Sequence, residues 1–567
     1  MQAKPTRDIA AEAPGAPVSG RCGGWRSSIV PVVGVLLVWA AWSAAPVPGV
    51  NEAHYFTKAR QFWDPAWLPR DLFLGSQVAH WLFYAVLGWP TTFLSMDTTV
   101  WLSRALGWSA LALGWCCLTK AWNWTAWETI AGAVLFAVCS SELNLSGEWV
   151  IGGSEAKVFA YAAVLCALAA ACRSRWSRVW MWLGLATAWH PLVGGWSFLI
   201  LLGVRLGRWR LEPGKLAEYW SLAGGVGCGL LLGVVPALRC DWGVDPDTQH
   251  LAHWIYVRQR LAHHLYVWDF PIWSGLRFAG MLLVWREFSR GISRSSGTEV
   301  CQTFAWGSMG LVLIGIVLSS AFVPDWIANS LLRFYWYRLA DFAIPLVAAW
   351  AVIEALATSR RRASPGRASG GEALRVDPTW ERFTKVRSWC AGLLLLAALV
   401  VVGNRAVDHA RDPVSGSDRQ ALPEYPGEPE RTAATRRNWH RVCAWVQANT
   451  PRDAYCLTPR YQQTFKWLAE RAEYVNWKDV PQDARSLVVW AERMSAVYGG
   501  GWDQGSPLWM EPTELAQLAA EHQVDYLIAE QRDYEAYQAA GWVQGWERIY
   551  PPNAAQQTTY VVLKRLP

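Results

Sequence analysis

Residues 29–55 have the sequence IVPVVGVLLVWAAWSAAPVPGVNEAHY. The first part, 29–47, is apolar and long enough to cross a bilayer, for which a helix needs about 17 to 20 apolar residues. The small residues before Pro46 also resemble a signal-peptide cleavage site, but a proline at the first mature position argues against cleavage. We therefore expect a membrane helix, followed at once by a polar segment that carries Glu52 and His54.

The overall composition agrees with a membrane protein. Hydrophobic residues make up 53% of the 567 residues and charged residues only 17%, whereas soluble proteins carry roughly 25% charged residues. The 41 tryptophans fit the same class, because tryptophan favours the membrane–water interface. The mean hydropathy is only +0.10, which indicates that a sizeable polar region accompanies the apolar helices.

Working outward from the first apolar run, the sequence predicts about eleven transmembrane helices. The least certain boundary is His190-Pro191, where one kinked helix is the alternative to two short ones, and Pro191 with Gly194-Gly195 favours a turn. The predicted spans are 29–47, 98–118, 126–141, 156–172, 179–190, 192–204, 219–238, 272–285, 303–323, 339–356 and 388–401.

The positions of the basic residues favour the two-helix interpretation. Short cytoplasmic loops are enriched in Lys and Arg, and every basic cluster falls on the cytoplasmic side if the N-terminal segment, 1–28, is cytoplasmic. Merging the two helices would move the cluster at Arg360 outside. We therefore predict a multi-pass protein of the cytoplasmic (inner) membrane. Because the basic residues form no continuous face, nucleic acid is excluded as a partner.

Beyond the last span the hydropathy pattern changes. Residues 405–437 are predicted to be a linker, and residues 438–567 a small extracytoplasmic α/β domain, because helical and strand patterns alternate there. The segment contains no GxGxxG motif, P-loop or nucleophile elbow. Its predicted helices are 439–448, 462–471, 484–495 and 512–522, and its predicted strands are 454–457, 524–529 and 558–563.

The external loops contain the ionisable residues that a reaction would need, and on this topology they converge on one membrane face. The long first external loop, 48–97, begins with Glu52 and His54, and the next external loop ends with Glu155 and Lys157. The remaining candidates lie in two later external segments: Arg258, Arg260, His263 and His264 in one, and Arg333, Arg338 and Asp341 in the other.

Each cluster also has a structural explanation. Glu52 could be a solvated interfacial carboxylate, and Glu155 could simply stabilise the start of a helix through the helix dipole. The adjacent histidines could pack among interfacial aromatic side chains. Arg333 and Arg338, however, lie outside against the charge rule, which indicates an anionic partner.

This arrangement resembles the GT-C superfamily of membrane glycosyltransferases, which use polyprenyl-phosphate-linked sugars, and is similar to an uncharacterised bacterial branch of it. The resemblance rests on Glu52 just after the first span, the long first external loop, short paired middle spans, an external C-terminal domain, and the acidic residues of the second external loop, Glu142, Glu148 and Glu155. It implies a GT-C-like transmembrane domain, 29–404, a lipid-linked sugar donor, and a glycan, lipid or protein acceptor.

The resemblance also implies roles for the candidate residues. Glu52 would be the base that takes the acceptor proton, with His54 or Glu155 as its partner. Where His54 stands, family members often have a second acid, so dependence on a divalent metal stays open and no other cofactor is indicated. The possible metal ligands are Glu52, His54, Glu155, His263 and His264. The candidate phosphate- or substrate-binding residues are Lys157, Arg258, Arg260, His263, His264, Arg333, Arg338 and Asp341.

Two other classes of protein stay open. One is a transporter or flippase for an anionic lipid-linked substrate, in which the same cations bind without reacting. Transporters, however, usually place ionisable groups at mid-membrane on broken helices, whereas most of these lie in loops at one face. The other is a non-catalytic envelope assembly protein whose C-terminal domain binds a partner.

Overall fold

The structure, a computed structural model, describes residues 26–209, 214–290, 292, 296–363, 378–412, 414–425, 427–553 and 558–567. The predicted cytoplasmic N-terminal segment, 1–28, therefore lies almost wholly outside the described residues. The basic loop that follows residue 363 lies outside them as well.

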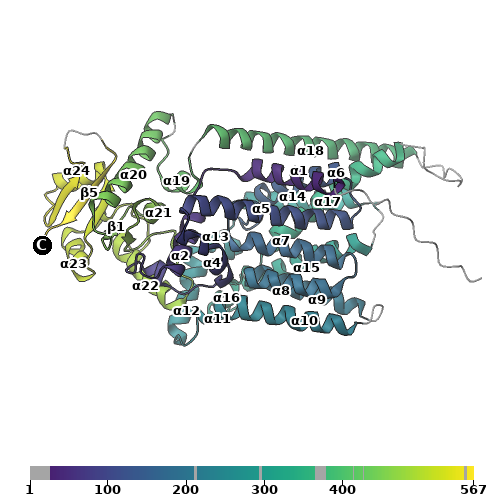
Figure 1. Ribbon diagram of the computed structural model, residues 1–567, viewed down its shortest axis with the longest axis horizontal. Coiled ribbons are helices and arrows are strands. Elements are labelled where there is room, and N and C mark those ends of the chain that lie inside the picture. The colour runs from purple at the N-terminus through teal and green to yellow at the C-terminus, as the bar shows by residue number, and fades with distance from the viewer. Residues whose placement is uncertain are drawn as a thin grey trace, which may run out of the picture.

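Every one of the eleven predicted spans is helical, and these helices run side by side in one bundle (Figure 1). Helix α10 continues through the π-helical turn η2 into α11. The bundle consists of α1 (Arg26–Ser43), α5 (Met96–Ala121), α6 (Ala126–Glu142), α7 (Ala156–Ala171), α8 (Trp176–Trp189), α9 (Pro191–Arg208), α10 (Leu216–Gly229), η2 (Leu230–Val234), α11 (Val235–Arg239), α14 (Ile272–Ser289), α15 (Ser296–Leu318), α17 (Ala340–Ala363) and α18 (Pro378–Arg411).

Within the part of the chain that the structure describes, four stretches of helix are long and apolar enough to cross a membrane by length and composition: Leu216–Arg239, Gly297–Leu318, Ala340–Thr358 and Lys385–Arg411. Two shorter apolar helices, Ile29–Ser43 and Ala156–Ala171, accompany them. The chain is a multi-pass membrane protein, and the number of eleven crossings stays a prediction.

The break at His190-Pro191 separates two short helices, as predicted. Helix α8 ends at Trp189 and α9 begins at Pro191, which occupies the first helical position, where a proline sacrifices no intrahelical hydrogen bond. Gly194 lies so close to Thr187 that an added Cβ would clash with its backbone, so the turn is tight.

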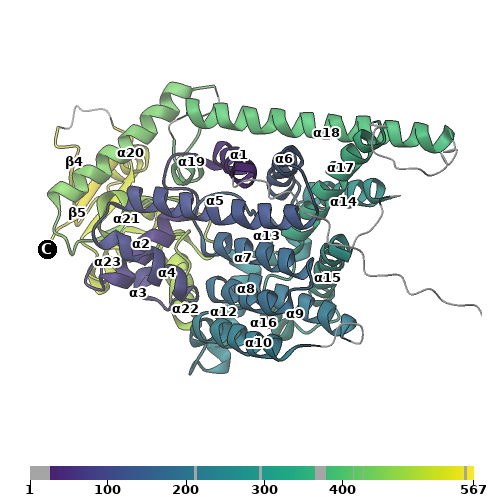
Figure 2. The same cartoon turned by 45° about the vertical axis from the view of Figure 1, so that its right-hand side comes forward.

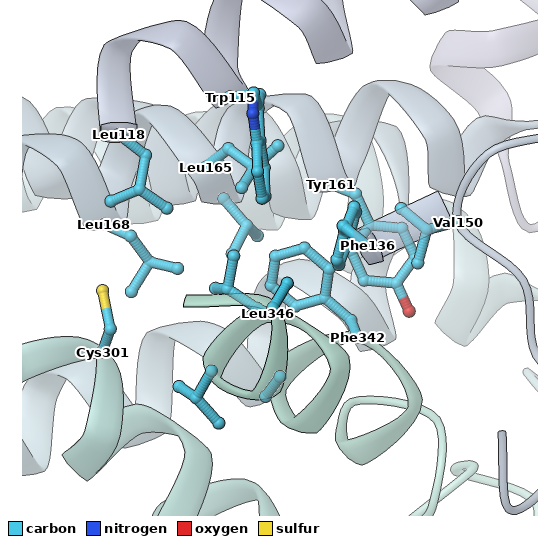
Figure 3. Close-up of a cluster of buried hydrophobic side chains, with 14 of the residues drawn as sticks. Trp115, Leu118, Phe136, Val150, Tyr161, Leu165, Leu168, Cys301, Phe342 and Leu346 are labelled. Carbon is cyan, nitrogen blue, oxygen red and sulfur yellow. The ribbon is translucent and has the colours of Figure 1, made fainter. Parts of the chain in front are cut away.

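The core of the bundle lies between α5, α6, α7, α15 and α17 (Figure 3). Trp115 stacks on Phe136 with ring centroids 5.1 Å apart, and Tyr161 stacks on Phe342 at 4.8 Å. Small residues bring the helices close: a Cβ on Gly114 of α5 would lie 2.8 Å from the Ala162 carbonyl of α7. Close approach at small residues is typical of membrane helix pairs.

The contact between α8 and α10 gives a prediction about stability. Side chains added at Gly184 or Gly225 would clash with the backbone of the facing helix, whereas Gly227 faces open space. Gly225→Leu should therefore push the helices apart and destabilise the protein by about 1–3 kcal/mol, as overpacking does. Gly227→Leu should leave stability unchanged. Thermal unfolding in detergent measures both, and equal melting temperatures would contradict the close packing.

Short helices gather at the end of the bundle that carries the C-terminal domain (Figures 1 and 2). The opposite end carries basic loop residues, where Arg173 donates to Cys117 O and Arg208 pairs with Glu299. The short helices are α2 (Glu52–Trp63), α3 (Leu72–Gly75), α4 (Trp81–Leu87), η1 (Trp89–Thr92), α12 (Pro246–Trp254), η3 (Ile255–Arg260), α13 (Ala262–Leu265), η4 (Val267–Asp269) and α16 (Asp325–Leu332).

The C-terminal region is an α/β domain with a five-stranded mixed sheet in the order β2-β1-β3-β5-β4. Strand β1 pairs in parallel with β2 and β3, and β5 pairs antiparallel with β3 and β4. Successive residues of β3 face opposite sides of the sheet: Ile528 packs against α20 in one hydrophobic core, and Leu527 packs in the other core, which includes α22. Its elements are α20 (Pro429–Asn449), β1 (Tyr455–Leu457), α21 (Phe465–Ala469), β2 (Ala472–Glu473), α22 (Ala484–Tyr498), η6 (Pro507–Trp509), α23 (Pro512–Glu521), β3 (Tyr526–Glu530), α24 (Gln531–Ala539), β4 (Trp546–Tyr550) and β5 (Tyr560–Arg565).

The segment 405–437 differs from the linker that the sequence suggests. Helix α18 continues to Arg411, a further helix, α19 (Gly416–Ala421), follows, and α20 already begins at Pro429. The Ser417 hydroxyl donates to Gly49 O at 2.7 Å, which ties α19 to the segment after α1. Strands β2 and β4 and helix α24 are also additional to the predicted elements.

Candidate functional site

Glu155 is the N-cap residue of α7, and it lines two cavities at the end of the bundle that carries the C-terminal domain. Its Oε1 accepts a hydrogen bond of 2.6 Å from Asn51 Nδ2, and its Oε2 lies 3.3 Å from Lys157 Nζ. The side chain makes no capping hydrogen bond to the helix. The carboxylate is therefore held between the first external loop and α7 and faces open space on both sides.

A buried ion-pair network adjoins Glu155. Glu148 accepts from Arg338 Nε at 2.8 Å and Nη2 at 2.5 Å, and from Lys157 Nζ at 3.0 Å. Burial would raise the pKa of Glu148, but the charges of Arg338 and Lys157 outweigh it and lower the pKa to about 2. Glu148 thus stays ionised and fixes the positions of both cations.

Asp341 positions the loop that carries Glu148. Its carboxylate accepts from the Leu145 amide at 2.6 Å and from the Ser146 amide and hydroxyl at 3.0 and 2.7 Å. His264 also contacts this loop, through Ser146 O. The predicted substrate-binding residue Asp341 therefore already uses both of its oxygens to hold the loop in place.

Glu52 forms a buried ion pair. Its Oε1 accepts from Arg104 Nε at 2.7 Å and the Ser154 amide at 2.7 Å, and its Oε2 from Arg104 Nη2 at 2.6 Å and the Gly49 amide at 2.5 Å. Both side chains are 1% exposed. Four donors thus occupy the two oxygens of the predicted base, although Glu52 and Arg104 both line the second cavity.

The first cavity, of about 350 Å³, contains buried nitrogen atoms without hydrogen-bond partners. These are Arg333 Nε, His80 Nδ1 and His253 Nε2, the last of which lies 3.8 Å from Asp241 Oδ2. Arg333 Nη1 is held by Asp241 Oδ2 at 2.5 Å. Burial and the charge of Arg338 lower the pKa of His80 to about 3, so its ring is neutral. Buried polar atoms usually have partners, and the polar groups of a ligand in this cavity can supply them.

An apolar groove of about 430 Å³ adjoins this cavity. Its lining comes from α8, α9 and α10, with the glycines of the close α8–α10 contact at its floor. The groove and the cavity share Pro191, Leu192, Val234 and Phe334. A ligand with a polar head in the cavity can therefore extend a hydrocarbon chain between the membrane helices.

The second cavity, of about 890 Å³, has a different lining. Side-chain amides, aromatic rings and paired charges surround it, among them Asn51, Asn404, Trp149 and the pair Arg405–Glu142 at 3.1 Å. Such groups bind hydroxyl-rich molecules by hydrogen bonds and ring contacts. Glu155 is reached from both cavities.

Several predicted site residues lie elsewhere. His54 turns toward the C-terminal domain, with Nδ1 3.4 Å from Lys478 O, so it is no partner of Glu52. Arg258 pairs with Asp325 at 2.9 Å and Asn329 at 2.8 Å, and Arg260 stacks on Trp477 at 4.4 Å. Neither arginine lines the two cavities. His263 is exposed and packs against His264.

The candidate metal ligands do not gather into one site. Within the described part of the chain, no group of three or more His, Cys, Asp or Glu side chains is arranged to hold a metal ion. Glu52 is enclosed by donors, His54 faces the C-terminal domain, and His263 is exposed.

The sequence interpretation missed His80, His253 and Asp241 and left out Arg104 as a partner of Glu52. A signal for two of them exists: the chain has only ten histidines, and His80 and His253 both lie in the predicted external segments. The partner of Glu52 is separated by 52 residues, and no local pattern identifies such a contact.

The C-terminal domain closes the site from outside. Gln482, Ala484 and Leu487 line the first cavity. Lys466 Nζ lies 3.0 Å from Asp71 Oδ2 of the first external loop, in a buried cluster with Glu473 and Asp479. Further contacts to that loop are Arg60–Glu470 at 3.1 Å, Arg70–Asp525 at 3.3 Å and Gln77 N to Asp483 at 3.0 Å.

Two solved structures resemble this fold. One is the crystal structure of ArnT from Cupriavidus metallidurans in the apo state, with a TM-score of 0.45, 13% identity, and coverage of 96% of this chain and 98% of that one. The other is the archaeal oligosaccharyltransferase AglB from Archaeoglobus fulgidus in complex with an inhibitory peptide and a dolichol-phosphate, with a TM-score of 0.42, 13% identity, and coverage of 94% and 74%.

One family model matches part of the chain. Residues 437–497 match a domain of unknown function (DUF6798). The matched stretch extends from α20 to α22 and includes Lys466 and Asp483, which contact the first external loop. No curated protein matches the chain.

Proposed function

We propose that the protein is a membrane glycosyltransferase that moves a sugar from a polyprenyl-phosphate donor to an acceptor at the outer face of the cytoplasmic membrane. The observation that carries the proposal is the first cavity, which Arg333, His253 and His80 line and which shares four lining residues with an apolar groove. In this topology the N-terminus is cytoplasmic and the C-terminal domain is extracytoplasmic.

The donor would place its phosphate in the first cavity and its chain in the groove. Arg333 and Arg338 supply fixed donors to the phosphate, whose negative charge grows as the sugar leaves. Arg338 also donates to His190 Nε2 at 2.9 Å and stacks on Tyr335 at 3.7 Å, so its position is fixed before the reaction. Preformed donors of this kind stabilise the transition state without reorganisation.

The acceptor would enter the second cavity, and Glu155 would act as the base between the two. Its carboxylate takes the proton of the acceptor hydroxyl, the hydroxyl oxygen bonds to the anomeric carbon, and the bond from that carbon to the phosphate oxygen breaks. Polyprenyl phosphate leaves. Glu155 is a better candidate than Glu52 because Glu52 gives both oxygens to Arg104 and two amides.

Arg338→Lys tests whether Arg338 binds the phosphate of the donor. A lysine cannot form the fork that joins Glu148, His190 and a phosphate, so transfer should fall about ten- to hundredfold, the equivalent of one or two charge-assisted hydrogen bonds. The measurement is transfer of radiolabelled sugar from a polyprenyl-phosphate donor by protein in lipid. Arg258→Lys, which changes an arginine outside both cavities, should stay near wild type.

The same assay separates the alternatives. Saturable binding of the lipid phosphate that needs Arg333 and Arg338, without any release of sugar, would contradict the transferase and favour a transporter or flippase. Equal effects of Arg338→Lys and Arg258→Lys would contradict the phosphate role of Arg338.

A further inference from the structure

A third cavity, of about 470 Å³, lies away from Glu155, between the C-terminal domain and the outer ends of the bundle helices. Its walls are α20, α21, the start of α19, the segment after α1 and the start of α5. These elements lie together at the junction between bundle and domain in both views (Figures 1 and 2). We name it the α20 cavity.

Helix α20 presents a row of basic side chains to this cavity. The sequence Arg436-Arg437-Asn438-Trp439-His440-Arg441 repeats its basic residues at a spacing of four, so that they lie on neighbouring positions of the helix surface. Trp439, which lies between them in sequence, is fully buried in the domain core. The helix thus buries its apolar face in the domain and turns its basic side to the α20 cavity.

Two of the four basic side chains in this row, Arg436 and His440, pair with carboxylates, and the other two do not. The Arg437 and Arg441 side chains are exposed, and neither has a partner among the described residues. Arg436 donates from Nη2 to Glu424 at 2.9 Å, while its Nε is buried without a partner. Like charges four residues apart on a helix repel each other, so the row is unfavourable unless an anion lies against it.

The carboxylates that line the cavity do not neutralise the two arginines. Asp418 accepts from His440 Nε2 at 2.8 Å and from Thr464 at 2.9 Å, and Asp97 accepts from Trp467 Nε1 at 3.0 Å. The hydrogen bond to Asp418 raises the pKa of His440. His440 therefore adds positive character to the same surface.

In the proposed topology the α20 cavity lies near the outer membrane surface. It is lined by Val47, just after α1, and by Asp97 in the first turn of α5. Phe93 and Trp101, on either side of Asp97 in sequence, are 59% and 39% exposed. Exposed aromatic side chains at helix ends are typical of the interface where lipid headgroups lie.

We propose that the α20 cavity binds a phosphate group at the membrane surface, held by Arg437 and Arg441 with Arg436 and His440 beside them. Arginine forks match phosphate geometry, and a phosphate would remove the repulsion along α20. The phosphate comes from an anionic phospholipid headgroup or from free phosphate, two sources with one chemistry. This site is independent of the proposed transfer reaction.

The experiment uses the full chain, purified in phosphate-free detergent. Phosphatidylglycerol or inorganic phosphate is titrated separately, with phosphatidylcholine as the uncharged reference, and the melting temperature gives the apparent affinity. The double variant Arg437→Gln/Arg441→Gln should bind on the order of tenfold more weakly or worse, because it loses two charge-assisted contacts. Both residues are exposed, so the variant should fold.

The control Arg452→Gln/Lys564→Gln removes two exposed charges of the same domain that do not line the cavity. A response to phosphatidylglycerol alone that the control keeps and the double variant loses supports a headgroup site. The same pattern with inorganic phosphate as well supports a site for phosphate in general. The proposal is overturned if the wild type responds to neither probe, or if the control and the double variant lose the response equally.

Discussion

Glu155→Gln should lower the rate of sugar transfer by about 100- to 10,000-fold, the usual contribution of a general base. The glutamine keeps the shape of the side chain and still accepts from Asn51, but it cannot take a proton from the acceptor hydroxyl. Lys157 keeps its ion pair with Glu148 at 3.0 Å, so the melting temperature should change little. The rate is measured in a single turnover with a radiolabelled polyprenyl-phosphate sugar, which isolates the chemical step.

The affinity for the lipid-linked sugar donor distinguishes a catalytic base from a residue that only binds the donor. If Glu155 acts as the base, the affinity for the lipid donor should stay within a few-fold of wild type while the rate collapses. Glu287→Gln is the matched control: Glu287 is a half-exposed residue of α14 that pairs with Arg286 and Arg290 and lines none of the cavities described above. Unchanged turnover in Glu155→Gln, together with lost turnover in a folded Glu52→Gln, would return the role of base to Glu52.

The bundle was predictable because each helix is encoded by an apolar run. The two short helices at His190-Pro191 were also predictable, since Pro191 fits the first position of a helix and charge placement required a turn. The short outer helices were not predicted individually, because their apolar faces form only against each other and against the C-terminal domain. In that domain, α24 buries only Tyr534 and Tyr537, which gives too weak a pattern.

The candidate site was predictable only as a region. The four external clusters lie next to one another: Glu52 accepts from the Ser154 amide, Arg338 contacts Glu148 next to Lys157, and His264 contacts Ser146. Which arginines line the first cavity depends on helix register. Arg258 and Arg260 lie on a π-helical turn, where the first contacts Asp325 and the second contacts Trp477. A turn with the wider i→i+5 spacing is not visible in sequence periodicity.

The same limit explains Glu52. Its position directly after the first span was evident, but its partner Arg104 lies on α5 and could equally have been a snorkelling arginine. Whether a buried carboxylate is reactive or structural depends on how many donors surround it, and that number is set by tertiary packing. Glu52 has four donors, whereas Glu155 has Asn51 and a lysine that it shares with Glu148.

Arg104→Ala should destabilise the protein by about 3–5 kcal/mol, because it leaves the buried Glu52 carboxylate without its countercharge. The two amide donors to Glu52 remain, but they cannot replace a bidentate guanidinium. Glu52→Gln should be destabilising for the converse reason, since the charge of Arg104 would then be buried unpaired. Thermal unfolding of each variant in the same detergent measures the effect.

The double variant Glu52→Leu/Arg104→Met completes a double-mutant cycle with the two single variants. It removes both charges at once and should be more stable than Arg104→Ala, because the penalty of a buried ion pair arises mainly when one partner stays behind. If the ion pair is structural, we therefore expect both single variants to have lowered melting temperatures and the double variant to recover part of that decrease. If Glu52→Gln instead kept the wild-type melting temperature and lost only its activity, Glu52 would be a reactive carboxylate, and the ion pair would serve catalysis rather than the attachment of the first external loop to α5.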